Sequence, residues 1–194
     1  MKRTGSTSLL LAALAASSLF GSTHADPLHA FGNEGAWVHV DSGWQYPKDV
    51  DGFARVGQPY NMDGNNDAGA EYRQASGQLL AEVEIYAADS AATAASLDGA
   101  KAMAAGKAGE AARAASEKPF AIAALPGASG VKVRYVVKGR AAAPQTNLYF
   151  FTTDLWRIKV VASAADGGKD GDRALDAFVR ALPWRTLGTD SGLH

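Results

Sequence analysis

Residues 130–165 read GVKVRYVVKGRAAAPQTNLYFFTTDLWRIKVVASAA, and no other part of the sequence is as rich in β-branched and aromatic residues. Between positions 131 and 137, valine and tyrosine alternate with lysine and arginine, which is typical of a strand with one buried face. Residues 147–151 are apolar on both parities, so we expect both sides of that strand to be covered. Residues 155–163 alternate again. The stretch predicts three consecutive strands in the middle of an antiparallel sheet.

Further strands are predicted on the N-terminal side of this stretch. Residues 70–75 and 79–87 flank Ser76-Gly77, a two-residue hairpin signal. Shorter strands are expected at residues 37–41 and from about Phe53 to Val56. Residues 61–69 have the composition of a turn.

Two helices are predicted between and after these strands. Asp89-Ser90 can cap an alanine-rich helix that continues to about Ala115, with breaks at Gly106 and Gly109 as an alternative; Leu97 and Met103 are its bulky apolar residues. The second helix, residues 172–182, places four apolar residues on one face at the spacing i, i+3, i+4, i+7, namely Leu175, Phe178, Val179 and Leu182. The predicted fold class is α+β: a mainly antiparallel β-sheet with a long Ala-rich helix and a C-terminal amphipathic helix packed on one face.

The first residues have the pattern of a Sec-type signal peptide. Lys2 and Arg3 precede an apolar run from Ser8 to Phe20, and cleavage is expected between Ala25 and Asp26. The predicted organisation is a signal peptide (1–25), an ill-ordered lead-in with a short strand (26–43), one α+β domain (44–184) and a flexible tail (185–194). We therefore expect a periplasmic or secreted protein with no integral membrane segment after cleavage.

Composition excludes several kinds of chemistry. The chain has no cysteine, so neither disulfides nor cysteine-ligated metals can occur. It has 19 basic and 20 acidic residues, and without the two signal-peptide cations the formal net charge is −3. This balance argues against nucleic acid as a partner, because nucleic-acid binding needs a concentrated basic surface.

The order of predicted elements, the GWQYP stretch beginning at Gly43 and the closing helix that ends in LPW together resemble the PsbP-like family. That family of small exported or lumenal domains includes the periplasmic DcrB-type proteins. The resemblance covers most of residues 44–184 and implies a similar fold. It implies no catalytic residues, because the family has no shared active-site pattern to match.

Candidate catalytic residues are few. His39 shares a strand face with Asp41 and could act as a base or ligand, although a surface histidine on an edge strand is the simpler interpretation. Glu82 and Glu84 lie about 7 Å apart on one strand face, within the range that glycosidases use. The simpler interpretation is cross-strand pairing with basic residues of neighbouring strands, for which the candidates are Arg73, Lys132, Arg134, Arg157 and Lys159.

Oxygen ligands alternate in the segment from Asp63 to Glu71, and Asp63, Asn65, Asp67 and Glu71 could hold a hard cation. Ala68 and Gln74 stand where an EF-hand loop needs glycine and glutamate, so we favour an ordinary turn. The HExxH, GxSxG and Walker-type motifs are absent from the sequence. We therefore expect no cofactor.

Aromatic residues could line an apolar pocket if the N-terminal and central groups meet. The candidates are Trp44, Tyr46, Tyr149, Phe150 and Trp156, and packing in the core is the alternative. The leading functional hypothesis is a non-enzymatic exported domain that binds a protein partner or a small ligand. The alternatives are a hydrolase that uses carboxylates on the charged sheet face and a calcium-stabilised structural protein.

Overall fold

The computed structural model describes residues 28–31, 35–62, 66–125, 127–137 and 144–188. The predicted signal peptide and the last six residues of the predicted tail lie outside these ranges. Among the described residues, no helix has both the length and the apolar character needed to cross a membrane.

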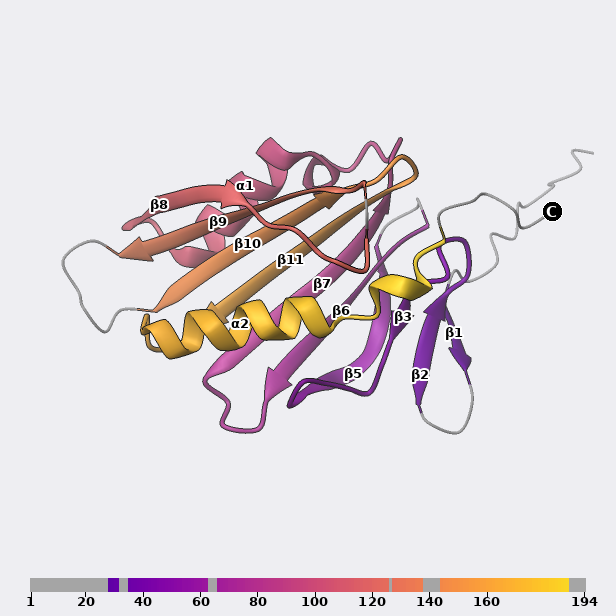
Figure 1. Ribbon diagram of the computed structural model, residues 1–194, viewed down its shortest axis with the longest axis horizontal. Helices are drawn as coiled ribbons and strands as arrows, with labels where there is room; N and C mark the ends of the chain where they lie inside the picture. The colour runs from indigo at the N-terminus through magenta and orange to yellow at the C-terminus, as the bar shows by residue number, and fades with distance from the viewer. Residues whose placement is uncertain (1–27, 32–34, 63–65, 126, 138–143, 189–194) are drawn as a thin grey trace, which may run out of the picture.

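The main sheet has eight strands, and each neighbouring pair is antiparallel (Figure 1). The spatial order is β4 (Asp49–Val50), β5 (Phe53–Met62), β6 (Asp67–Gln74), β7 (Leu79–Ala87), β11 (Trp156–Ala164), β10 (Gln145–Thr152), β9 (Ser129–Val137) and β8 (Ala112–Pro119). The three strands predicted in residues 130–165 are confirmed as β9, β10 and β11. The predicted hairpin is confirmed as β6 and β7.

A second, three-stranded sheet precedes the main one. It consists of β1 (Leu28–Phe31), β2 (Ala36–His39) and β3 (Gln45–Tyr46), again antiparallel. The prediction of an ill-ordered lead-in with one short strand (26–43) is wrong for β1, because this strand pairs with β2 along its whole length and buries Leu28.

The first helix is shorter than predicted. α1 covers Leu97–Ala108 and is capped by Ser96, whose Oγ accepts a hydrogen bond from the Gly99 amide, and not by Asp89-Ser90. It ends because Gly109 adopts φ 94°, a conformation that other residues rarely take. The chain then extends into β8, where the sequence predicts helix up to about Ala115. A short 3-10 turn, η1 (Thr93–Ala95), precedes α1.

The second helix, α2 (Lys169–Ala181), is followed by the 3-10 turn η2 (Trp184–Thr186). It buries Leu175, Phe178 and Val179. Trp184 and Leu187 are also buried, so the chain after α2 returns to the core before residue 189.

The two helices lie on opposite faces of the sheet, so the prediction that both pack on one face is wrong. Leu148 lies opposite Val133 and Val161, and this row joins the apolar cluster that contains the buried alanines of α1. The next residue, Tyr149, points to the other face and joins the cluster of α2. Figure 1 shows α2 in front of the strands and α1 behind them. The two-sided apolar pattern of residues 147–151 agrees with a strand covered on both faces, although the sequence predicts both helices on one of them.

Neither helix covers the whole width of its face. α1 packs mainly on β8, β9 and β10, whereas α2 packs on β11 and β7. On the α1 side, the half of the sheet formed by β5, β6 and β7 therefore carries exposed apolar residues, including Val56 and Leu80.

Candidate functional site

A groove of about 200 Å³ opens on the α1 side of the sheet, over β5, β6 and β7. Its walls combine two exposed apolar residues with charged ones: Val56, Glu71, Arg73, Leu80, Glu82 and Lys107. All but one of these side chains come from the sheet, and Lys107 comes from the last turn of α1. The groove exists because α1 ends beside this half of the sheet and does not extend over it.

Two carboxylates of the groove lie side by side on neighbouring strands. Glu71 on β6 lies directly opposite Glu82 on β7, an arrangement that destabilises a strand pair unless a cation compensates it. Lys107 forms an ion pair with Glu82, and Tyr60 Oη donates a hydrogen bond to Glu82 Oε1 at 3.1 Å. Burial and the nearby Lys159 lower the pKa of Lys107, and Glu71 offsets part of this effect. Glu82 thus has two donors within the protein.

Glu84 lies two residues further along β7 on the same face and is buried. It forms an ion pair with the fully buried Lys159 and accepts a hydrogen bond from Tyr86 Oη. Burial first, and then the charge of Glu84, raise the pKa of Tyr86. Lys159 Nζ also lies 5.7 Å from the Tyr86 ring centre and 3.9 Å from Met103 Sδ. The carboxylate of Glu84 is enclosed by these neighbours.

Glu82 and Glu84 therefore share a face, as predicted, but only Glu82 lines the groove. Their carboxylates project from one strand and do not face each other across a cleft. Glu84 pairs with Lys159, as the cross-strand interpretation predicts. Lys132 and Arg134 do not take part, because they point to the opposite face.

His39 is buried, so the prediction of a surface histidine is wrong. Its Nδ1 accepts a hydrogen bond from Ser42 Oγ at 2.7 Å, and its Nε2 donates to the Asn66 carbonyl at 2.5 Å. The ring lies 5.5 Å from that of Trp156 in a T-shaped arrangement. Burial lowers the pKa of His39. The neighbouring Asp41 accepts a hydrogen bond from the Asn66 side chain. His39 thus links the small sheet to the segment before β6, away from the groove.

The predicted cation ligands do not converge where they are described. Asp67 accepts hydrogen bonds from the Ala87 amide at 3.2 Å and from Ser90 Oγ at 2.7 Å. Burial raises its pKa, while these two bonds act in the opposite direction. Glu71 lies four residues further along β6, roughly 13 Å away by strand geometry. Asp63 and Asn65 lie outside the described residues. Within the described ranges, no group of three or more acidic or histidine side chains could hold a metal ion.

The five aromatic pocket candidates are core residues. Trp44, Tyr46, Tyr149 and Trp156 are buried in the cluster beneath α2, and Phe150 is buried in the cluster beneath α1. None of them lines the groove. Trp44 packs against Trp184, with ring centres 5.2 Å apart.

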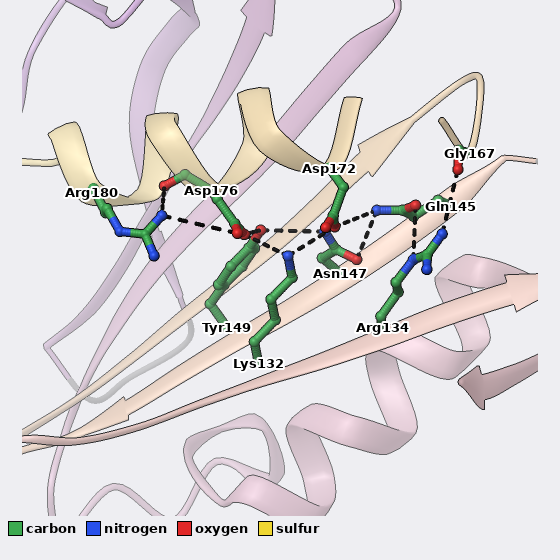
Figure 2. A network of polar contacts seen from close by, with 9 residues as sticks. All are labelled: Lys132, Arg134, Gln145, Asn147, Tyr149, Gly167, Asp172, Asp176 and Arg180. Atoms are coloured by element: carbon green, nitrogen blue, oxygen red, sulfur yellow. Dashed lines mark hydrogen bonds and ion pairs between the residues drawn. The ribbon is translucent and has the colours of Figure 1, made fainter. Parts of the chain in front are cut away.

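A polar network on the α2 side was not predicted from the sequence (Figure 2). The ammonium of the buried Lys132 lies 2.8 Å from Asp172 and 2.5 Å from Asp176, two carboxylates one helical turn apart on α2. Asp172 also accepts hydrogen bonds from Gln145 and Asn147, and Tyr149 donates to Asp176. Burial raises the pKa of Asp172, but its donors, led by Lys132, outweigh this, so the net pKa is lowered. The network fixes α2 to β9 and β10.

The i, i+4 spacing of Asp172 and Asp176 was the available signal for this network. It becomes useful only once α2 is assigned to the face to which Lys132 points. Comparison of the sequence with known protein families gives no match, and comparison with curated proteins also gives none.

Proposed function

We propose that this chain is a non-enzymatic exported domain that binds a small ligand in the groove over β5, β6 and β7. The observation that carries the proposal is the character of the groove. It combines exposed apolar side chains with charged ones, next to an otherwise well-packed sheet. A concave site with apolar walls and a few convergent polar groups is the usual form of a ligand site.

The size of the groove favours a small ligand over a protein partner. A stable protein interface takes roughly 20–30 residues from each side, whereas this groove is lined by ten residues. Its volume of about 200 Å³ is also below the roughly 300–1,000 Å³ of pockets for drug-sized molecules. The ligand is therefore a small solute.

Binding fits the state of the carboxylates better than hydrolysis does. A general acid or base has to reach the substrate. Glu84 is enclosed by Lys159 and Tyr86, and Glu82 is held by Lys107 and Tyr60. Export to the periplasm rests on the signal-peptide pattern of residues 1–25, and the kinship we propose with PsbP-like domains rests on element order and the GWQYP and LPW segments.

A thermal-shift screen of small metabolites tests this proposal. A ligand that binds only the native state raises the melting temperature by mass action. Leu80→Trp fills the groove, and Val40→Trp is the matched control because Val40 is similarly exposed (38% against 43% for Leu80) but lies elsewhere. We expect at least one compound to stabilise the wild type and the Val40 variant but not the Leu80 variant. Stabilisation that survives Leu80→Trp, or no stabilising compound at all, would contradict the groove as a ligand site.

A further inference from the structure

We infer that the ligand of this groove is a zwitterion of about dipeptide size, whose ammonium group lies at Glu71 and whose carboxylate lies at Arg73. The inference rests on the proposed function, because it names the ligand class of the same groove. It follows from which charges in the groove already have partners and which do not.

Two of the four charged walls satisfy each other. Glu82 and Lys107 form an ion pair, and Tyr60 supplies a further donor to Glu82. Glu71 and Arg73 are both exposed, and neither forms a hydrogen bond or an ion pair with any described residue. Burial lowers the pKa of Lys107 and the charge of Glu71 offsets part of this effect, but the ion-pair partner of Lys107 is Glu82. One anion and one cation are thus free to contact a ligand.

The geometry of β6 separates these two free charges by a useful distance. Glu71 and Arg73 are two residues apart on one strand, so both point into the groove and their backbone positions lie about 7 Å apart. Their side chains can approach or separate by rotation. The two terminal charges of a dipeptide match this spacing with opposite signs.

The groove as a whole favours a neutral ligand with separated charges. It contains two carboxylates and two cations, so it offers no net attraction to a purely anionic or purely cationic solute. The carboxylate of Glu71, which is not the ion-pair partner of Lys107, favours an ammonium group at one end. Arg73 lies at the other end, where a guanidinium can hold a carboxylate through two hydrogen bonds.

The apolar part of the groove adds a requirement for an aliphatic side chain. Val56 and Leu80 are both exposed, and Val161 is buried in the floor. Covering exposed apolar surface stabilises a complex in proportion to the area removed from water. We therefore chose glycyl-L-leucine as the probe, because it carries both terminal charges and an isobutyl group.

Titration followed by amide chemical shifts in NMR tests the inference. Glycyl-L-leucine is compared with N-acetylglycyl-L-leucine, which lacks the ammonium group, and with glycyl-L-leucinamide, which lacks the carboxylate. We expect the zwitterion to shift amides of β6 and β7, and each derivative to bind about tenfold more weakly, as the loss of one charge-assisted contact implies. Glu71→Gln should remove the preference over the N-acetyl derivative, and Arg73→Gln the preference over the amide.

Glu110→Gln and Arg185→Gln are the matched controls, because both residues are exposed and lie outside the groove. They should bind the probe like the wild type. Equal binding of the three compounds, unchanged selectivity in the Glu71 and Arg73 variants, or no shifts at millimolar probe would overturn the inference. If the metabolite screen finds a ligand that Leu80→Trp blocks but that is no zwitterion, the proposed function stands and only this inference fails.

Discussion

The two helices have nearly the same length, 12 residues in α1 and 13 in α2, but they attach to the sheet in different ways. α2 buries Leu175, Phe178 and Val179 and adds the Lys132 network at its N-terminal half (Figure 2). The fully buried residues of α1 are only glycine and alanine; of its two long apolar side chains, Leu97 is partly buried against the cluster beneath the helix and Met103 is 40% exposed. Attachment therefore depends on the side-chain area that a helix buries and not on its length.

This difference separates structure from the proposed function. The small buried residues of α1 suit close packing on β10, and the helix ends early enough to leave β5, β6 and β7 open on that side. Its last turn contributes Lys107 to the groove. α2 lies on the opposite face from the groove and holds the core together. Substitutions in the two helices should consequently have different effects.

The largest effect is expected for Phe178→Ala in α2. The ring is fully buried, with its centre 4.4 Å from that of Phe53 and 5.4 Å from that of Tyr72. Its removal should cost about 3–5 kcal/mol, because buried phenylalanines leave large cavities. Urea denaturation measures the loss. A loss below about 1 kcal/mol would mean that the core beneath α2 does not depend on this side chain.

Breaking the Lys132 network should have the next largest effect. Replacing both Asp172 and Asp176 with asparagine leaves the buried ammonium of Lys132 without an opposite charge. We expect a loss of about 3 kcal/mol in urea denaturation, at the low end for such groups because asparagine oxygens still accept hydrogen bonds.

Two variants sharpen this test. Asp170→Asn on the same helix removes an ion pair that is almost fully exposed, so it should change stability very little. Adding Lys132→Met to the double variant should recover part of the loss, because an apolar replacement no longer buries an unpaired charge. No recovery in the triple variant would show that the hydrogen bonds, and not the charges, hold α2.

The same network should make the free energy of unfolding decrease as the pH is lowered. The pKa of Asp172 is lowered in the folded protein, so the unfolded state binds protons more readily in the acid range. The stabilisation is fully present above the unfolded value of about 3.9 and is lost as the pH falls from there through the lowered folded pKa. Urea midpoints measured between pH 6 and pH 2, about the range in which carboxylates titrate, should fall less steeply for Asp172→Asn than for the wild type. Equal slopes would contradict this prediction.

The sequence predicts the fold well where period and turn chemistry agree. Alternation identifies β9 and β11, and Ser76-Gly77 identifies the β6–β7 hairpin. The helix prediction fails between Gly109 and Ala115, where helix-forming alanines continue into β8. There the positive φ of Gly109 and pairing with β9 override local propensity. The prediction for His39 also fails, because a buried histidine with two hydrogen-bond partners has no local pattern that distinguishes it from a surface one.

The candidate site was only partly predictable. The shared face of Glu82 and Glu84 follows from strand parity alone. Whether each carboxylate is free depends on neighbours that are distant in the sequence. Lys159 of β11 pairs with Glu84, and Lys107 of α1 pairs with Glu82. The sequence does not show on which face of the sheet α1 lies, so the second pair could not be predicted. Glu71 enters the sequence analysis as a cation ligand. Its place opposite Glu82 depends on the β6–β7 register, which the hairpin turn sets.

The smallest effect is expected for Met103→Ala in α1. This variant tests directly whether α1 is attached to the sheet more weakly than α2. Met103 is 40% exposed, and its best-defined contact is the 3.9 Å approach of Sδ to Lys159 Nζ. Truncation removes little buried area, and alanine is the better helix former. The shorter side chain also lets water approach Lys159 and Glu84, which reduces the cost of burying that ion pair. The loss in urea denaturation should stay below about 1 kcal/mol. A loss as large as that of Phe178→Ala would show that α1 is held by this one side chain, and the contrast between the two helices would no longer hold.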